Sequence, residues 1–478
     1  MTEATLIRNA ELYGSGTLAD VRLAGGVIDR IGSALPAGPG DSVVDARGAA
    51  LLPGLHDHHI HLVSLAAALQ SLSCGPPTVA NAQQLAAALR AANQEAGDWL
   101  RGIGYHPAVA GDIDRHWLDR HIPDRPCRIQ HRGGRLWVLN SRALAELGLL
   151  ATGARPPGLE LRDGEATGRL YEEDLWLRRQ LRSRIPDIGV ASHLLASYGI
   201  TGLTDTTPHN GVEEWRFFGA QQNNGSLLQG VRMMGTTDIA GCEETDALQR
   251  GELKIHLLES QLPEFGELCR AIEAAHRSGR GVAVHCVTLA ELVFTLGAFE
   301  SVGSIAGDRI EHASVTPDEQ LAQIRALGLR VVTQPHFIAE RGDQYLAEVD
   351  PRDQPWLYRC AGFRNAGIPL AAGSDAAFGQ ADPWAAMRAA VERRTPSGRV
   401  LGATEALSPE QALALFLSPA DAPGVSVRKV EAGALADLCL LDRNWGLARE
   451  TLRHTLVRAV WRAGQLIHGQ NALNGQVD

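Results

Sequence analysis

Residues 53–62 read PGLHDHHIHL, and this stretch of the chain decides the predicted fold. It contains four histidines, of which His59 and His61 stand two positions apart. Alternate side chains of a β-strand point to the same face, so these two imidazoles lie on one side of the strand. Two imidazoles held on a rigid strand suit zinc, iron or nickel. The stretch therefore indicates a strand with a pair of metal ligands at its end; the other interpretation is a polar strand end without a metal.

Seven further segments with strand character follow this first one along the chain. Amphipathic helical stretches separate them, which is typical of parallel βαβ units and predicts an α/β protein. Eight strands that are each followed by a helix close a (β/α)8 TIM barrel. The expected strands are residues 50–62, 199–205, 227–235, 251–258, 281–287, 308–314, 329–337 and 368–376.

The spacing of these segments also predicts the domain organisation. Roughly 140 residues separate the first two expected strands, far more than a crossover needs, so we expect residues 75–190 to be an inserted subdomain over the barrel mouth. Residues 1–52 and 424–478 consist of short β-like segments punctuated by glycine and aspartate. We therefore expect both ends to form one small β-sandwich domain beside a barrel of residues 53–423.

The length and charge of the chain limit the classes of partner. A chain of 478 residues exceeds what one core usually supports, which agrees with a barrel and a smaller domain. The net charge of −10 disfavours nucleic acid and anionic membranes, and no apolar run of about 18 residues indicates a membrane span. The first residues lack a secretion signal and the seven cysteines contain no CxxC pair, so we expect a cytoplasmic protein with reduced thiols. A small-molecule substrate is the expected partner; the oligomeric state stays open, with a homodimer as one option.

Single ionisable residues stand at the ends of four later strand segments: Lys254, His285, His312 and Asp375. Each has apolar or small neighbours, and a charged or imidazole group at the end of a buried strand is costly without a partner. The carboxyl ends of barrel strands are also where active sites of this fold lie. We therefore predict that these side chains meet the two strand-end histidines at one site, although each alone could be a satisfied core histidine or a helix cap.

Lysine is rare in this chain. Only Lys254 and Lys429 are lysines among the 45 basic residues, yet one of the two stands inside the strand segment GELKIHLL. A buried amine with a lowered pKa can react with carbon dioxide to form a carbamate, whose oxygens can bridge two cations. A guanidinium cannot do this. The alternative is that Lys254 is a buried ion-pair partner.

Several motifs resemble those of a known family. PGLHDHHIHL is similar to the opening motif of the amidohydrolase superfamily, and RIEHAS and AAGSDA are similar to its strand-six and strand-eight motifs. RLWVLNSRALAELGL, DGEATGRLYEE, TQPHF, GSDAAFGQADPW and GALADLCLLD resemble the amidohydrolase 3 group, which includes N-substituted formamide deformylases. The resemblance covers most of the chain.

This resemblance implies a divalent metal centre of one or two ions, with zinc as the expected metal. It implies that His59 and His61 bind one metal, that Lys254 is carboxylated and bridges, and that His285 and His312 bind the second. Asp375 is implied both as a metal ligand and as the catalytic residue that moves protons. The implied reaction is hydrolysis of an amide-type carbon–nitrogen bond by hydroxide generated at the metal. The strand spacing selects the same six residues.

The sequence departs from the usual pattern of this group around the expected substrate position. Gly134-Arg135 stands in place of a Gly-His pair, Thr204-Asp205 in place of His-Asp, and Thr288-Leu289 in place of Gly-Asp. These changes call the usual formamide substrate into question. Arg135 suggests an anionic group, such as a carboxylate, on the substrate; a surface or structural arginine is the other interpretation.

Further candidates for substrate contact are His336, His256, Tyr105 and Trp137. His336 ends the seventh expected strand, and His256 shares a strand face with Lys254. Either histidine could contact the substrate or hydrogen-bond to a metal ligand. Tyr105 and Trp137 lie in the inserted region and could line the pocket.

Two other functions are compatible with these residues. A mononuclear deaminase of the same superfamily would need a glutamate soon after His285, where the nearest is Glu291, six residues on. Such deaminases generally do without a lysine on the fourth strand. A catalytically silent binding protein that keeps the barrel is the third hypothesis, and the presence of all six ligand-type residues argues against it.

Overall fold

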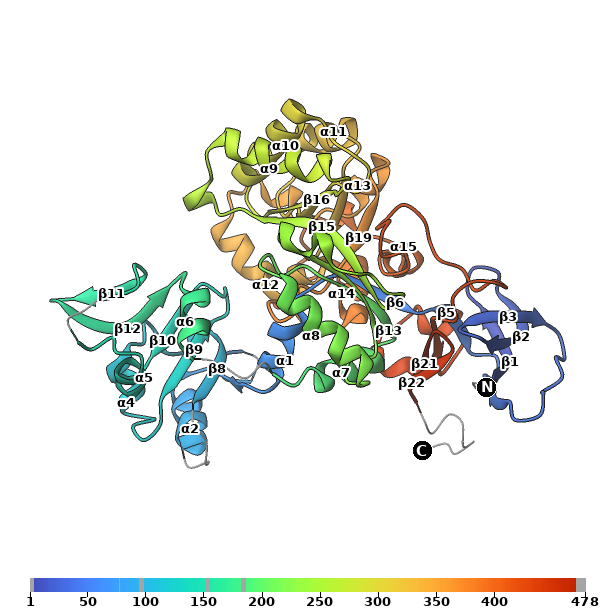
Figure 1. Cartoon of the computed structure of the whole chain (residues 1–478), viewed down its shortest axis with the longest axis horizontal. Coiled ribbons are helices and arrows are strands. Elements are labelled where there is room, and N and C mark those ends of the chain that lie inside the picture. The colour runs from blue at the N-terminus through green and yellow to red at the C-terminus, as the bar shows by residue number, and fades with distance from the viewer. Residues whose placement is uncertain (1–3, 77, 94–98, 152–154, 182–185, 470–478) are drawn as a thin grey trace. The chain divides into compact units, whose positions relative to one another are not determined.

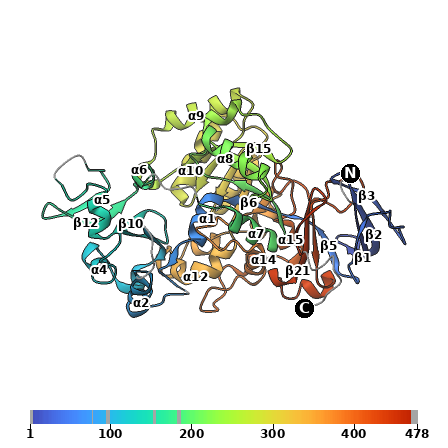
Figure 2. The ribbon, with the colours of Figure 1, turned by 60° about the horizontal axis from the view of Figure 1, so that its bottom comes forward.

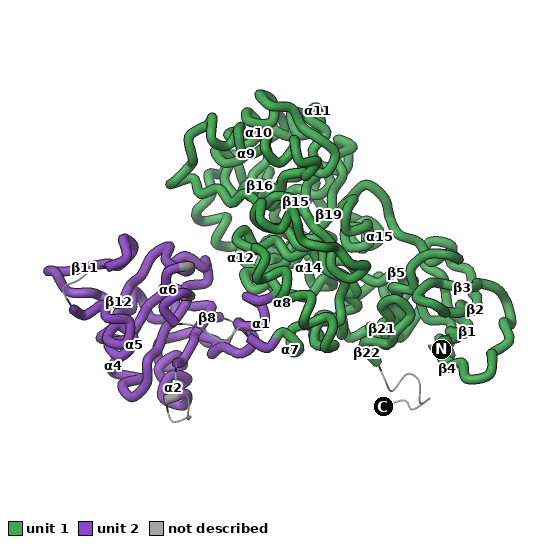
Figure 3. Tube along the Cα trace, in the orientation of Figure 1, with its two compact units in different colours: residues 1–62, 188–478 green, residues 63–187 purple. Residues whose placement is uncertain are grey.

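The computed structural model of the chain describes residues 4–76, 78–93, 99–151, 155–181 and 186–469. The chain forms two compact units (Figure 3). Unit 1 consists of Met1–Leu62 and Ile188–Asp478, and unit 2 consists of Val63–Asp187. Within the described residues, no helix combines the length and the apolar character that crossing a membrane requires.

Unit 1 contains a nearly closed barrel of eight parallel strands, in the order β19-β18-β17-β16-β15-β14-β13-β6. All eight strands overlap the segments that the sequence predicts, with β15 beginning three residues earlier than expected, so the (β/α)8 prediction is confirmed. Their side chains are buried almost throughout, as expected for strands that are covered on both faces. The bounds are β6 (Leu55–Ile60), β13 (Ile200–Asp205), β14 (Gly230–Gly235), β15 (Leu248–His256), β16 (Val282–Cys286), β17 (Arg309–His312), β18 (Arg330–Thr333) and β19 (Leu370–Ala372).

The barrel closes between its first and last strands, just beyond β19. The backbone nitrogen of Asp375 donates to the carbonyl of His59 at 2.7 Å, and the nitrogen of His61 donates to the carbonyl of Ala376 at 2.8 Å. A Cβ atom at Gly373 would lie 2.3 Å from the backbone nitrogen of His59, so only glycine permits this approach. The carboxylate of Asp57 accepts hydrogen bonds from the backbone nitrogens of His59 at 3.1 Å and Ser374 at 3.0 Å. Closure therefore brings the end of β19 against the histidines of β6.

Helices follow the strands along the chain and lie around the barrel sheet (Figures 1 and 2). In α9, for example, the buried residues Leu268, Ile272 and Ala275 recur at helical spacing. The hydroxyl of Thr288 and the carboxylate of Glu291 form a capping box that starts α10 directly after β16. The helices are α7 (Gly189–Ser197), α8 (Val212–Asn223), α9 (Phe265–Arg277), α10 (Leu289–Val302), α11 (Asp318–Ala326), α12 (His336–Glu348), α13 (Ala361–Asn365), α14 (Pro383–Glu392) and α15 (Pro409–Ala414).

The strands from both ends of the chain share one sheet, in the order β22-β21-β20-β5-β1-β2-β3, with β4 paired to β1. The N-terminal and C-terminal strands meet where β5 pairs antiparallel with β20, Leu51 opposite Leu440. Their inward side chains form a separate apolar core that includes Trp461. The strands are β1 (Thr5–Leu12), β2 (Thr17–Ala24), β3 (Val27–Gly32), β4 (Ser42–Asp45), β5 (Ala50–Pro53), β20 (Leu438–Leu441), β21 (Val457–Arg462) and β22 (Gln465–His468).

Unit 2 occupies the stretch of chain between β6 and β13. It contains a six-stranded sheet in the order β11-β12-β10-β9-β8-β7, with two apolar clusters of its own. The strands are β7 (Leu72–Ser73), β8 (Leu100–Tyr105), β9 (Cys127–His131), β10 (Leu136–Leu139), β11 (Leu159–Arg162) and β12 (Glu165–Tyr171). The helices are α1 (Leu62–Leu69), which begins at the boundary, α2 (Ala82–Asn93), α3 (Pro107–Ala110), α4 (Arg115–Asp119), α5 (Ser141–Glu146) and α6 (Asp174–Leu181).

Candidate metal centre

The four histidines at β6 divide into two pairs with different surroundings. The Nε2 atom of His56 hydrogen-bonds to the Thr204 hydroxyl at 2.9 Å, and Nε2 of His58 to the Ser418 hydroxyl at 2.9 Å. Both rings are buried, and burial holds the pKa of each well below 6.5. These two histidines are therefore neutral structural residues at neutral pH, which leaves His59 and His61 as the pair for a metal.

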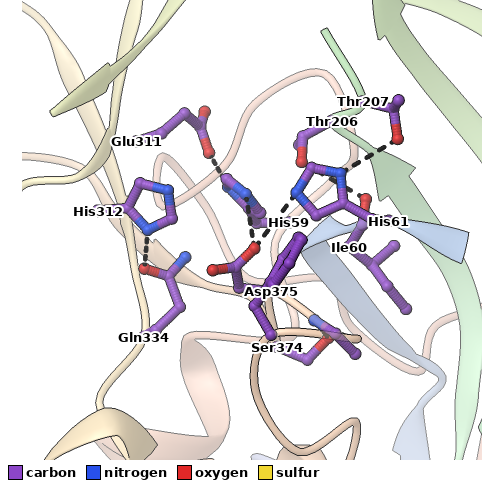
Figure 4. Close-up of polar contacts among 12 residues, drawn as sticks. His59, Ile60, His61, Thr206, Thr207, Glu311, His312, Gln334, Ser374 and Asp375 are labelled. Atoms are coloured by element: carbon purple, nitrogen blue, oxygen red, sulfur yellow. Dashed lines mark hydrogen bonds and ion pairs between the residues drawn. The ribbon is translucent and has the colours of Figure 1, made fainter. Parts of the chain in front are cut away.

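His59, His61 and Asp375 form a cluster at the point where the barrel closes (Figure 4). Nε2 of His59 lies 3.4 Å from Oδ1 of Asp375, and Nε2 of His61 lies 3.3 Å from the same oxygen. One possible ligand atom from each residue lies within 4.8 Å of the others. Two nitrogens and a carboxylate oxygen at this spacing are a set of ligands that one divalent metal ion can bind.

Two further predicted histidines continue from this cluster across the neighbouring strands. The ring centroids of His59 and His312 lie 4.7 Å apart, and those of His312 and His285 lie 4.5 Å apart. The β16–β17 register sets this arrangement, since Cys286 pairs with His312. The ring of His256 then lies 4.3 Å from that of His285. Residues far apart in the sequence thus form one continuous group of imidazoles.

Three of these histidines have their Nδ1 atom occupied by a neighbour (Figure 4). Nδ1 of His59 contacts the Glu311 carboxylate, Nδ1 of His61 lies 3.1 Å from the Thr207 hydroxyl, and Nδ1 of His312 lies 2.7 Å from Oε1 of Gln334. An amide oxygen accepts a hydrogen bond from Nδ1–H, so the proton of the neutral ring is on Nδ1 and the lone pair of His312 is on Nε2. That Nε2 atom is buried and has no hydrogen-bond partner in the described part of the chain. This is the pattern in which a second hydrogen bond orients a metal-binding histidine.

Lys254 lies on β15, next to β16, and its side chain is buried. Among the described residues its Nζ atom has no hydrogen-bond partner. Burial lowers the pKa of Lys254, and this effect outweighs the opposite influence of the Glu311 and Asp375 carboxylates. A buried amine without a partner is costly as an ammonium ion. As a carbamate, the same side chain would instead bind metal ions through its oxygens.

The protonation states around the cluster suit metal binding. Burial holds the pKa of His285 well below 6.5 and lowers the pKa of His312 to about 3, so both rings are neutral at neutral pH. Burial would raise the pKa of Asp375, but hydrogen bonds from His59 and His61 hold it well below the usual value. Burial would lower the pKa of His59, but the Glu311 and Asp375 carboxylates outweigh it and raise this pKa. A metal at this site would displace a proton from His59.

Glu311 and Arg309 are functional candidates that the sequence analysis did not single out, although both lie in the RIEHAS motif. Both side chains are 0% exposed, and Nε of Arg309 contacts Oε1 of Glu311. Nη2 of Arg309 also donates to the carbonyl of His58 at 2.8 Å. The signal in the sequence was a pair of opposite charges two positions apart on a buried strand. Glu311 thus connects the buried arginine to His59.

The model of the amidohydrolase family matches residues 42–468, which is most of the chain. The chain belongs to the amidohydrolase family. It is 25% identical over 507 aligned residues to the N-substituted formamide deformylase of Arthrobacter pascens, covering 92% of this chain and 90% of that protein.

Two solved structures share the amidohydrolase fold of the chain. An uncharacterized metal-dependent hydrolase from Pyrococcus horikoshii OT3 superimposes with a TM-score of 0.74 at 23% identity, over 98% of this chain and 100% of that one. Another from Pyrococcus furiosus gives a TM-score of 0.70 at 23% identity, over 92% and 99%. At this identity the likeness concerns the fold.

The secondary candidates on the barrel of this amidohydrolase have different surroundings. His336 begins α12, and its Nε2 atom donates to the carbonyl of Ser374 at 2.9 Å, directly before Asp375. His336 therefore supports the segment that carries Asp375. His256 ends β15 with an exposed side chain beside His285.

The other secondary candidates lie in unit 2. Tyr105 is buried and its hydroxyl donates to the carbonyl of Gly111. Trp137 is buried and its Nε1 atom donates to Asp174 at 2.8 Å. Arg135 is half-exposed and lies 3.7 Å from the carboxylate of Glu172. Each of these contacts is internal to unit 2, so a role of the three residues in substrate binding stays a prediction.

Proposed function

We propose that the chain is a binuclear metal-dependent hydrolase that cleaves an amide-type, non-peptide carbon–nitrogen bond. Membership of the amidohydrolase family makes it a hydrolase of carbon–nitrogen bonds. The observation that carries the binuclear proposal is the group of imidazole nitrogens beside Asp375 and an unpartnered buried Lys254. The proposed ligands are His59, His61, Lys254, His285, His312 and Asp375.

The donor set fits divalent zinc. Imidazole nitrogens and carboxylate oxygens are common zinc ligands, and His59, His61 and Asp375 offer both kinds. The unpartnered Nε2 atom of His312 is a further donor. Lys254 would join this set as a carbamate: its neutral Nζ attacks the carbon of carbon dioxide and loses one proton, which yields one negative charge shared by two oxygens. Such a group could bridge two ions.

The chemistry that zinc supplies at such a site is to lower the pKa of water and to polarise a carbonyl. Asp375 lies beside both His59 and His61, and its lowered pKa keeps it ionised at neutral pH. Its carboxylate is therefore the group that would accept a proton from the attacking water. The resulting acid could then donate that proton to the leaving nitrogen. Glu311, Thr207 and Gln334 would keep the three histidines in their orientation throughout.

The alternative of a mononuclear deaminase is less well supported. Its proton-transfer glutamate would have to be Glu291, which follows β16. The Glu291 carboxylate accepts hydrogen bonds from the backbone nitrogens of Val287 at 2.7 Å, Thr288 at 3.1 Å and Glu259 at 2.9 Å. It therefore caps α10 and holds a neighbouring loop. This engagement also favours a hydrolase over a deaminase that depends on this residue.

The experiment that tests the proposal compares Lys254→Ala with Lys429→Ala. The two lysines are the only ones in the chain, and Lys429 is exposed, so it is a matched control. Metal content is measured by plasma mass spectrometry, and hydrolysis is measured on N-formyl and N-acetyl amines. We expect two ions per chain in the wild type and the control, and one ion with little hydrolysis in Lys254→Ala. An unchanged metal content in Lys254→Ala would contradict the binuclear proposal. Ammonia release from amino-substituted rings by the wild type would instead support the deaminase.

A further inference from the structure

A half-buried arginine, Arg341, lies on α12 close to the candidate metal centre. Its guanidinium carbon lies 4.2 Å from the centroid of the Phe337 ring, which is a cation–π distance. One of its nitrogens donates to the carbonyl of Phe378. These two contacts hold the guanidinium between the start of α12 and the segment that follows β19.

That segment belongs to the metal centre. The backbone nitrogen of Phe378 donates to the carbonyl of Asp375 at 2.7 Å, and the ring of Phe378 packs edge-on against His61, with centroids 5.6 Å apart. A Cβ atom at Gly379 would lie 2.5 Å from the carbonyl of Ser374 and 2.7 Å from the ring of Phe337. The segment is thus packed tightly onto α12, and Arg341 is held against the segment that follows Asp375.

The charge of Arg341 is not neutralised by an ion pair. Within the described residues no carboxylate lies within 4.0 Å of its nitrogens, whereas the buried Arg309 and the half-buried Arg359 both have carboxylate partners. Its nearest acidic neighbour in the helix, Glu340, accepts a hydrogen bond from the backbone nitrogen of Gln380 at 3.0 Å. The carboxylates of Glu340 and Asp375 act on Arg341 only at longer range, and they help to raise its pKa. A cation that makes no direct ion pair beside a catalytic centre can attract an anionic group of the substrate.

We propose that Arg341 binds a carboxylate on the substrate, so that the enzyme acts on an anionic amide. This inference rests on the proposed hydrolase function and names its substrate class. A guanidinium presents a planar fork of donors that matches a carboxylate. The guanidinium of Arg341 lies over the Phe337 ring, which limits its freedom to move. The anion-binding role that the sequence suggested for Arg135 is thereby assigned to Arg341, which lies on the barrel and not in unit 2.

Two probes that differ only in a carboxylate test this assignment. N-formyl-L-phenylalanine and N-formyl-2-phenylethylamine are titrated calorimetrically into the zinc-loaded wild type and into Arg341→Ala, Arg341→Lys and Arg135→Ala. The exposed Arg352, whose partner is Asp350, provides the matched control Arg352→Ala. We expect the wild type to bind the acid at least about tenfold more tightly than the neutral probe. Arg341→Ala should abolish this preference, Arg341→Lys should keep part of it, and affinity for the neutral probe should change little.

The remaining outcomes overturn the proposal. If Arg341→Ala weakens both probes equally, the arginine only holds the Phe378 segment; if the preference is lost in Arg135→Ala instead, the assignment to Arg341 is wrong. Equal affinity of the wild type for both probes, or binding of neither, refutes the anionic substrate class. Formate release is measured separately. Binding of the acid through Arg341 without formate release would contradict the proposed hydrolase function but would support the carboxylate-binding site at Arg341.

Discussion

Replacing Glu311 with leucine should destabilise the barrel strongly, because the buried guanidinium of Arg309 loses the carboxylate with which it forms its direct ion pair. Both side chains are 0% exposed, and the Glu311 carboxylate contacts Nε of Arg309 and Nδ1 of His59. Arg309 also donates to the carbonyl of His58 at 2.8 Å, but this neutral acceptor does not neutralise its charge. The structure thus has one carboxylate that serves two buried groups.

The expected magnitude follows from the burial of the pair. Removing one partner of a buried ion pair costs about 3–5 kcal/mol, since the other charge stays desolvated. Arg309→Met should cost a similar amount for the same reason. Replacing both residues removes both charges, so the double variant should be no less stable than either single variant. The coupling free energy between the two positions should then be at least about 3 kcal/mol.

Urea denaturation of the metal-free protein, followed by circular dichroism, measures these free energies. The metal is removed so that changes in its affinity for His59 do not enter the result. The exposed pair of Arg352 and Asp350 is the control, because screened surface pairs contribute little. A loss below about 1 kcal/mol in Glu311→Leu, or strictly additive losses in the double variant, would refute the argument from burial.

Three further predictions follow from the site. Gly373→Ala should lower the free energy of unfolding by about 1–3 kcal/mol and weaken zinc binding about tenfold or more, because its Cβ would lie 2.3 Å from the backbone nitrogen of His59. The control is Gly241→Ala, whose Cβ would have no atom within 4 Å, and it should leave thermal unfolding and zinc titrations unchanged. Zinc at one hundred times its Kd should stabilise the wild type by about 2.7 kcal/mol, and His61→Asn should lose most of this gain; equal gains in a thermal shift assay would argue against His61 as a ligand. Burial holds the pKa of His56 well below 6.5, so the unfolded chain binds the proton first and stability falls as the pH drops below 6.5. The contribution of His56 to the change in unfolding free energy with pH should reach about 1.4 kcal/mol per pH unit. Urea denaturation of His56→Gln should therefore show a shallower pH dependence than the wild type, and an identical dependence would contradict the buried neutral state of His56.

The sequence by itself determined the barrel and the types of residue at its centre. Strand character depends on local alternation and on short apolar runs, which is why all eight barrel strands overlap the predicted segments. Ionisable residues at buried strand ends are equally local signals. They were sufficient to select His59, His61 and Asp375, which the structure brings together, and to mark Lys254 because lysine is otherwise almost absent.

Only the tertiary structure decided which neighbours these residues have. Glu311 contacts His59 from 252 positions away, and no local pattern specifies that pairing. A family pattern drew attention to Arg135, which lies beside Glu172, whereas only the structure showed that Arg341 contacts Phe337 and the carbonyl of Phe378. The physical reason is that hydrogen-bond partners and counterions are set by strand register and barrel closure. Those arise from contacts between distant segments, whereas a strand or a ligand type can be recognised within a few residues.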